Sequence, residues 1–231
     1  MTDVSDAIDN ESALASERAA ARLHPEAVPE GGVYSPTLLL YYKADSGFGA
    51  IGRVTDTNNH STLHTFPAGS FATDWTHIVQ SADRILYYNA VTGLGAIGRV
   101  TDKYDHETLR TFPAGSFATG WTHVVHTAGR ILYYNAVTGL AAVGQVTGTN
   151  DHETLHTFPA GSFATGWTHI VPTSAGRILY YNAATGLAAV GRITDTNDHE
   201  TLRTFPERVN KWGLPVPGSF AIGWTHIVPV F

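Results

Sequence analysis

The stretch Gly120-Trp121-Thr122-His123-Val124-Val125 decides the fold, because near-identical copies of it occur at three other places in the chain. The other copies occupy residues 74–79, 166–171 and 223–228. A run of β-branched and aromatic residues after a glycine is typical of a short β-strand. The stretch is therefore one strand of a unit that is present four times, and such a repeat determines the architecture.

Composition narrows the class of protein. The 231 residues are 43% hydrophobic and 15% charged, as in a folded globular protein, and a net charge of -6 without a lysine or arginine run argues against a nucleic-acid partner. The absence of cysteine excludes disulfides and thiolate chemistry. No apolar run is long enough to span a membrane, and the acidic first residues lack the apolar core of a secretory signal. We expect a protein that is cytoplasmic or released without a cleaved signal peptide.

Residues 1–36 differ in composition from the repeats that follow. Residues 11–24 are rich in alanine, glutamate and arginine and predict about three helical turns. Their large apolar residues are Leu14 and Leu23, so this segment would dock weakly. A stretch rich in proline and glycine follows. We therefore expect residues 1–36 to form a partly helical or disordered arm and linker, and residues 37–231 to form the repeat domain.

Two series of aromatic residues measure the repeat. The steps between the tyrosines are 46, 46 and 47 residues, at Tyr41, Tyr87, Tyr133 and Tyr180. The steps between the tryptophans are 46, 46 and 57 residues, at Trp75, Trp121, Trp167 and Trp224. The last step is longer because the fourth unit carries an insert, residues 207–216, which contains Trp212.

Each unit contains four strand signals separated by turn signals. In the second unit the expected strands are residues 85–90, 96–101, 107–112 and 121–125. Three of the connections are short enough for hairpins, whereas PAGSFATG is longer, contains a proline and suits a crossover between separate sheets. Four short strands in every 46 residues are the spacing of a β-propeller blade.

We therefore predict an all-β protein, a β-propeller of four blades with four antiparallel strands each. If PAGSFATG is the crossover, the WTHIV strand is innermost and the first blade lacks that strand. Residues 224–228 would then pair with residues 38–42 and close a monomeric ring of four blades. An open half-ring that pairs with another chain is the alternative.

A glycine stands in the middle of the second strand signal of each unit. Glycine weakens a strand, so its position indicates that another group needs the space. We expect the tryptophan of a neighbouring blade to fill it. The four glycines are Gly52, Gly98, Gly144 and Gly191.

Two histidine series recur with the units. One lies in WTHIV, and the other precedes the third strand signal of each unit, at His60, His106, His152 and His199; His64 and His156 add a third, partial series. Imidazole is a common metal ligand, but no tight ligand spacing such as H-E-x-x-H occurs. We interpret these histidines as repeated hydrogen-bonding residues in turns or blade contacts, and we expect neither a metal nor another cofactor.

A pair of carboxylates, Asp105 and Glu107, also recurs in the third and fourth units. Two such groups could perform acid–base chemistry, as in glycosidases. Here they recur in near-identical form on separate blades, whereas an enzyme site concentrates unlike residues in one place. We therefore predict that the protein is not an enzyme, with a hydrolase as the weakest of three candidate functions.

Units with the pattern (I/L)LYYN, then GxxxVGRV, TF and GSFATGWTHIV, resemble those of tachylectin-2 and tectonin-type β-propeller lectins, and of related bacterial propeller lectins. The resemblance extends over residues 38–231. It implies a protein that binds simple sugars or glycan ends, with one shallow site for each blade or blade junction.

The same units offer residues suited to sugars, because the C–H face of a pyranose packs on an aromatic ring while amides and charged groups bond its hydroxyls. The aromatic residues could equally be blade core. The units are not identical at these positions. Lys43 stands where the second unit has Asn89, Asp74 where it has Gly120, and Gln145 where it has Arg99, so the sites would differ. The candidate ligand-binding residues are Trp75, Trp121, Trp167, Trp224, Tyr42, Tyr88, Tyr134, Tyr181, Asn89, Asn135, Asn182, Arg53, Arg99 and Arg192.

We therefore predict a lectin that acts by multivalency. Each shallow site would be weak, and several sites on one rigid ring would raise the avidity for a glycan-coated surface. The expected partners are simple sugars or glycan ends, with homo-oligomers left open. The alternative is a protein-interaction or structural propeller without a sugar site.

Overall fold

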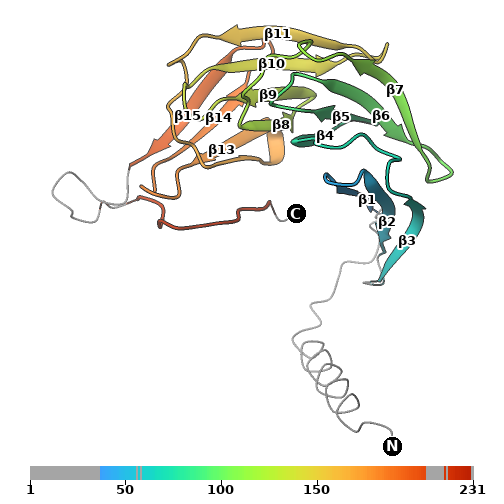
Figure 1. The fold of residues 1–231 in the computed structure, drawn as a ribbon. Helices are drawn as coiled ribbons and strands as arrows, with labels where there is room; N and C mark the ends of the chain where they lie inside the picture. Colours follow the sequence, from blue (N-terminus) through green and yellow to red (C-terminus); the bar gives the residue numbers. More distant parts are fainter. Residues whose placement is uncertain (1–36, 56, 58, 207–215, 217, 230–231) are drawn as a thin grey trace, which may run out of the picture. The chain divides into compact units, whose positions relative to one another are not determined.

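The structure, a computed structural model, describes residues 37–229 except residues 56, 58, 207–215 and 217 (Figure 1). The expectations for the arm of residues 1–36 and for the insert around Trp212 lie outside these residues. The strands are β1 (Thr37–Lys43), β2 (Phe48–Val54), β3 (His60–Phe66), β4 (His77–Ser81), β5 (Arg84–Tyr88), β6 (Gly95–Val100), β7 (His106–Phe112), β8 (His123–Thr127), β9 (Arg130–Tyr134), β10 (Ala141–Val146), β11 (His152–Phe158), β12 (His169–Pro172), β13 (Arg177–Tyr181), β14 (Ala188–Ile193) and β15 (His199–Phe205), with a 3₁₀ turn at Ser174–Gly176.

The strands form antiparallel sheets in which each strand pairs with its neighbour in the sequence. Three sheets have four strands, in the orders β4-β5-β6-β7, β8-β9-β10-β11 and β12-β13-β14-β15, and the first has three, β1-β2-β3. In Figure 1 the sheets follow one another in chain order from blue to orange. This confirms the predicted all-β propeller fold, its antiparallel blades and the strand order within them.

The hydrophobic core lies between successive sheets. Leu86 and Ile97 of the second sheet belong to one buried cluster with Val124, Ile131 and Tyr133 of the third. An equivalent cluster joins the third sheet to the fourth, and another joins the first to the second. Both faces of a middle sheet are therefore apolar, as its sequence indicates.

The innermost strands of neighbouring blades contact each other, β4 with β8 and β8 with β12. His77 Nε2 lies 3.3 Å from the carbonyl oxygen of Thr122, and His123 Nε2 lies 3.2 Å from that of Thr168. This confirms that the WTHIV histidines make blade contacts. The strand expected at residues 121–125 instead covers His123–Thr127, so the tryptophan precedes the strand.

The space beside each mid-strand glycine is filled by a histidine of the same blade. A Cβ atom on Gly144 would lie 2.7 Å from His152 Nε2, and the same relation holds between Gly98 and His106 at 2.5 Å. The expectation of a tryptophan from a neighbouring blade was therefore wrong. A β-bulge at Val143/Gly144 shifts the register of β10 against β11 next to this contact.

The expected closure of the ring by residues 224–228 is not formed, and this part of the prediction was wrong. β1 pairs with β2 alone among the described strands, and no strand is assigned within residues 218–229. Tyr41 and Trp224, which would meet in a closed ring, are 44% and 54% exposed. Both edges are therefore without a partner in the described part of the chain.

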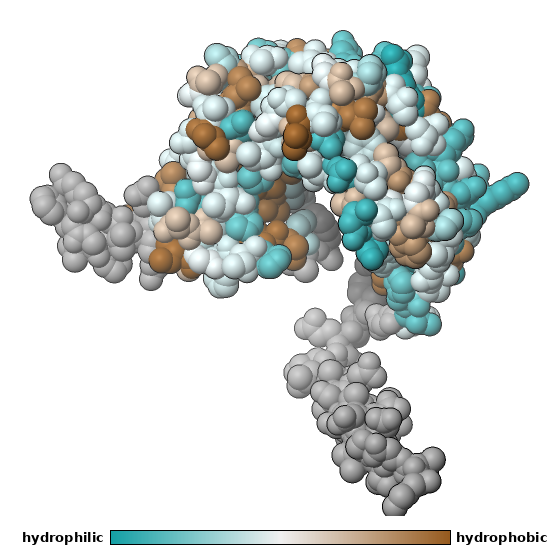
Figure 2. Space-filling view, viewed as in Figure 1, coloured by the Kyte–Doolittle hydropathy of each residue, from teal (hydrophilic) through white to brown (hydrophobic). Residues whose placement is uncertain are grey.

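The described surface mixes polar and apolar side chains. Figure 2 shows apolar residues in small groups among hydrophilic ones on the face in view. No helix among the described residues is long and apolar enough to cross a membrane.

Candidate functional site

Three equivalent small pockets recur in the second, third and fourth blades. Their volumes are about 100, 200 and 130 Å³. At about 30 Å³ for one water, the largest has room for roughly seven waters, so it could take one sugar ring at most. Each is lined by a phenylalanine, a tryptophan, a tyrosine, a histidine and threonines, namely Phe71, Trp75, Tyr87, His106 and Thr108; Phe117, Trp121, Tyr133, His152 and Thr154; and Phe163, Trp167, Tyr180, His199 and Thr201.

The polar heart of each pocket is a tyrosine–histidine pair. In the third blade Tyr133 and His152 share a hydrogen bond of 2.9 Å between Oη and Nε2, with their rings edge to face. The ring of Trp121 lies 5.9 Å from that of Tyr133. Because Gly144 has no side chain, the Nε2 end of the imidazole can approach β10 closely. The glycine, the histidine and the tyrosine therefore form one contact cluster.

The phenylalanine reaches the pocket from the crossover between two blades. Phe117 packs edge to face on Phe112 of the preceding blade, with ring centres 5.3 Å apart. On its other side it contacts His152 of the following blade at 4.6 Å. The hydroxyl of Tyr88 donates to the carbonyl oxygen of Ala118 at 2.7 Å and holds the crossover. Each pocket is therefore built from two successive repeats.

The pockets are electrically neutral. None of the described residues that line them is Asp, Glu, Lys or Arg. Burial lowers the pKa of His152 to about 4, against the weaker upward effects of Asp151 and Glu153. Burial also raises the pKa of Tyr133. At neutral pH the pocket therefore presents a neutral imidazole, a phenol and the hydroxyls of exposed threonines such as Thr154 and Thr157.

The tryptophans are the part of the predicted site that these pockets contain. Trp75, Trp121 and Trp167 line one pocket each. Trp224 lines none of them. The predicted tyrosines lie elsewhere, and their hydroxyls donate to carbonyl oxygens of the crossovers, Tyr42 to Ala72, Tyr88 to Ala118, Tyr134 to Ala164 and Tyr181 to Ala221.

The predicted asparagines hold turns. The amide nitrogen of Asn89 donates to the carbonyl oxygen of Asp74 at 2.8 Å, and its Oδ1 accepts from the backbone N–H groups of Val91 and Thr92 at 2.9 Å. Asn135 and Asn182 make the same three kinds of bond. These residues do not line the pockets, and their hydrogen bonds give them a structural role in the turns.

The predicted arginines also lie apart from the tryptophans. Arg99 and Arg192 pair with Glu107 and Glu200 at 2.8 Å, in partly exposed ion pairs on the outer strands. Arg53 lies opposite Ser61, and its Nε atom is buried without a hydrogen-bond partner among the described residues. The structure therefore does not bring the predicted tryptophan, tyrosine, asparagine and arginine into one cleft.

Sequence reasoning overlooked the Phe117, Tyr133, His152 and Thr154 series as pocket residues. One signal was present, because a tyrosine precedes a histidine by 19 residues in every unit. The carboxylates that recur beside this histidine serve the fold: Asp105 accepts from the backbone N–H of His106 at 2.8 Å, and Glu107 pairs with Arg99. Among the described residues no cluster of three or more His, Asp or Glu could hold a metal ion.

Replacing Asn89 tests its role in the turn. We expect Asn89→Ala to lower the free energy of unfolding by about 2 kcal/mol, because a buried side chain with three hydrogen bonds is removed. Thermal melting followed by circular dichroism measures the change. Val91→Ala, at an exposed position of the same turn, is the control and should melt like the parent. An unchanged melting temperature for Asn89→Ala would contradict the assignment.

Comparisons with known proteins show the fold. No family model matches the sequence, and no curated protein matches it. A protein from Lactobacillus plantarum has a TM-score of 0.50 at 12% identity, over 78% of this chain and 55% of that one. A protein of unknown function from Desulfotomaculum acetoxidans scores 0.47 at 12% identity, over 87% and 65%. Virginiamycin B lyase from Staphylococcus aureus scores 0.37 at 16% identity, over 81% and 59%.

These neighbours are β-propellers, and the likeness to the Lactobacillus plantarum protein agrees with the blade architecture. This chain spans a little over half the length of the Lactobacillus plantarum protein. The resemblance to tachylectin-2 and tectonin-type lectins stays a prediction from the sequence.

Proposed function

We propose that this propeller is a carbohydrate-binding protein with several equivalent weak sites, one at each junction where a pocket is built. The observation that carries the proposal is the repeated pocket, which combines an aromatic wall with neutral hydroxyl and imidazole groups. C–H groups of a sugar can contact the small part of Trp121 that lines the pocket, while its hydroxyls exchange hydrogen bonds with Thr154 and Thr157.

The charge of the pocket supports this class of ligand. A neutral lining favours a neutral ligand over a phosphate or a carboxylate, which would need a cationic partner. Each pocket is small, so the affinity of one site would be low and useful binding would depend on avidity. The proposed role is binding without catalysis, since the recurrent carboxylates are engaged in a turn and an ion pair.

A glycan array followed by titration of the best sugar tests the proposal. We expect binding to a restricted set of sugars, with millimolar affinity for each site. The triple variant Thr108→Val, Thr154→Val and Thr201→Val removes one hydroxyl from each pocket at nearly constant volume. Loss of about 1 kcal/mol of hydrogen bonding at each site should weaken binding roughly fivefold to tenfold.

The control is Thr119→Val with Thr165→Val, at exposed crossover positions that do not line the pockets. This variant should bind like the parent. A folded protein that binds no glycan at millimolar concentration would refute the proposal and favour the interaction scaffold.

A further inference from the structure

The segment that follows the fourth blade makes the same hydrogen bonds to its blade as the crossovers between blades make to theirs. The backbone N–H of Gly223 donates to the carbonyl oxygen of Ala183 at 2.7 Å, as that of Gly120 does to Ala90. The hydroxyl of Tyr181 donates to the carbonyl oxygen of Ala221 at 2.6 Å. Residues 218–225, which we call the exit segment, are therefore fixed in the geometry that leads into another innermost strand.

The side chains of the exit segment prepare half of a pocket. Phe220 packs edge to face on Phe205 at 5.1 Å, just as Phe117 packs on Phe112. Beyond Phe220 the backbone stays anchored, since the carbonyl oxygen of Thr225 lies 3.0 Å from His169 Nε2, but the tryptophan side chain is uncovered. Trp224 is 54% exposed, whereas Trp121 is 6% exposed at the equivalent position. The exit segment thus presents a phenylalanine and a tryptophan without the tyrosine and histidine that complete the other pockets.

The first blade presents the complementary half. Tyr41 and His60 share a hydrogen bond of 2.9 Å with their rings edge to face, as the pairs in the other blades do. The tyrosine is 44% exposed here, whereas Tyr133 is 3% exposed. A phenylalanine lies 4.4 to 4.6 Å from the equivalent histidine of each other blade. Phe220 and Trp224 are the two residues that this half lacks.

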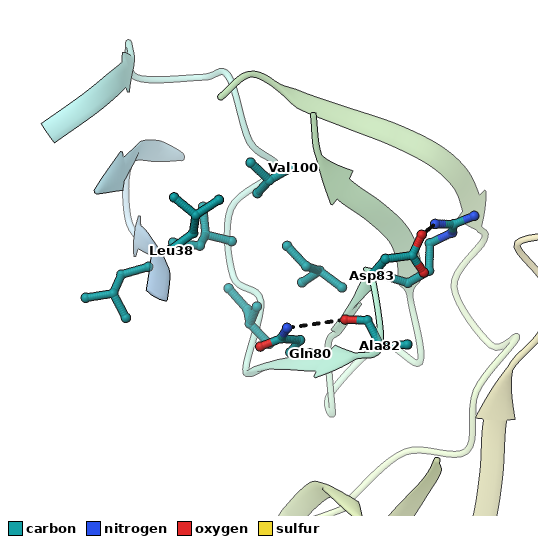
Figure 3. A pocket seen from close by; sticks show the side chains of 10 residues that line it. Leu38, Gln80, Ala82, Asp83 and Val100 are labelled. Carbon is teal, nitrogen blue, oxygen red and sulfur yellow. Dashed lines mark hydrogen bonds and ion pairs between the residues drawn. The ribbon is translucent and has the colours of Figure 1, made fainter. Parts of the chain in front are cut away.

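A cleft marks the place of the missing strand. It has a volume of about 400 Å³ and lies between β1 and the second blade, with Leu38, Ile78, Ile85 and Val100 among its lining residues (Figure 3). Its polar rim includes Gln80, which donates to the carbonyl oxygen of Ala82 at 3.2 Å, and the ion pair of Asp83 with Arg84. The cleft is therefore an apolar binding surface with a polar edge.

Residues 224–228 supply a strand that fits this cleft. In the second blade Val79 belongs to the innermost strand, lies opposite Leu86 and packs against the core shared with the third blade. The equivalent residue after the exit segment is Val228, which is 74% exposed. Paired in the same register, Val228 would lie opposite Leu40 and enter the cleft.

We propose that the occupant is a second copy of the chain: residues 224–228 of each copy add the missing strand to the first blade of the other. Both edges are open in the single chain, although each carries the residues that the other needs. The likeness to the Lactobacillus plantarum propeller covers 55% of that protein, so a propeller ring of that length has room for more blades than one copy supplies. Two copies joined head to tail at both ends complete such a ring by a closed two-fold arrangement.

Each junction then creates a fourth pocket, with Phe220 and Trp224 from one copy and Tyr41 and His60 from the other. That this pocket takes a sugar rests on the proposed function, whereas the assembly does not. The joined ring would offer four pockets for each chain in place of the three that one chain completes.

Sedimentation velocity on the full chain tests the assembly. We expect a species of twice the mass of one chain, and we expect Trp224→Ala and Tyr41→Ala each to shift it to single copies. Both side chains are exposed in the single chain, so their removal should not unfold the blades. Val137→Ala, at an exposed residue away from both edges, is the control and should keep the double mass. Double mass retained in both edge variants would overturn the proposal.

Thiol cross-linking distinguishes the second copy from closure within one chain, and the chain has no cysteine of its own. Leu40→Cys and Val228→Cys, made in separate chains and mixed, should form a disulfide-linked pair on oxidation. When both are placed in one chain, a cross-linked single copy would overturn the proposal in favour of self-closure.

Sugar titration follows on the same proteins. The parent should bind four equivalents for each chain, and Trp224→Ala should bind three. A ring that assembles and binds no sugar would refute the proposed function and leave the assembly standing. A ring that assembles but binds three equivalents for each chain would refute the fourth pocket.

Discussion

Acidification from pH 7 to pH 4 should destabilise the protein steeply, with most of the loss below pH 6.5. Burial lowers the pKa of His152 from 6.5 to about 4, so its imidazole is neutral in the folded protein while the unfolded chain takes up a proton. A group that binds more protons when unfolded favours unfolding as the pH falls. The stability it contributes is complete above pH 6.5 and is lost between pH 6.5 and about 4.

The size of the effect follows from the shift. A shift from 6.5 to about 4 corresponds to a loss on the order of 3 kcal/mol from His152 alone. Burial also lowers the pKa values of His106 and His199, the equivalent residues, and of His77 and His123 at the blade contacts. Protonation of these histidines therefore lowers the stability of the folded protein in several blades.

Melting temperatures measured between pH 8 and pH 4 give the profile. The melting temperature of the parent should be nearly constant above pH 7 and should fall below pH 7. His152→Gln keeps a hydrogen-bonding side chain that does not titrate, so its profile should be less steep between pH 6.5 and pH 4. A parent that melts at the same temperature at pH 7 and pH 4.5 would contradict the neutral state of these imidazoles.

Gly93→Ala should be among the most damaging single substitutions in the second blade. Gly93 has a φ of +69°, and a Cβ atom there would overlap the carbonyl oxygen of Phe117, with the backbone nitrogen of Gly115 only 3.2 Å away. Both neighbours are backbone atoms of the crossover, and Gly93 also accepts a hydrogen bond from the N–H of Phe117 at 3.0 Å. The added methyl group would therefore push the crossover and its pocket residues away from the hairpin.

Gly115→Ala is the matched control. Gly115 has a similar φ of +82°, but a Cβ atom there meets nothing within 4 Å. Left-handed strain alone should cost about 1–2 kcal/mol, and the overlap at Gly93 should add about 1–3 kcal/mol. For a chain of this size the difference corresponds to a further fall of roughly 2–12 °C in melting temperature. Equal melting temperatures would show that the hairpin does not press on the crossover.

The sequence predicts the propeller because its evidence is periodic. Units of about 46 residues, four strand signals and one long connection were enough to place β4 to β7 in their order. The start of the innermost strand was two residues off, since Trp121 has the composition of a strand residue but packs into the pocket before the strand begins.

The candidate site was harder to predict, because it depends on contacts across strands. Alternation along one strand indicates which face a side chain takes, but the bulge between Val143 and Gly144 changes the register against β11 and brings His152 onto the glycine. The recurrence of Asn89 was interpreted as ligand binding, although an asparagine that holds a turn recurs with the turn itself. Repetition alone cannot separate a binding residue from a structural one when both belong to every unit.

The crossover that carries Phe117 and Trp121 also governs how the gene of such a protein can change in length. Recombination between equivalent positions of two units removes or adds a whole repeat. Every remaining crossover then still places its phenylalanine and tryptophan in a pocket of the following blade. A deletion of half a unit instead separates Phe117 from His152 and leaves two incomplete pockets. Whole-unit duplication is therefore a single genetic step that preserves the sites, and the blade count is the quantity that it changes.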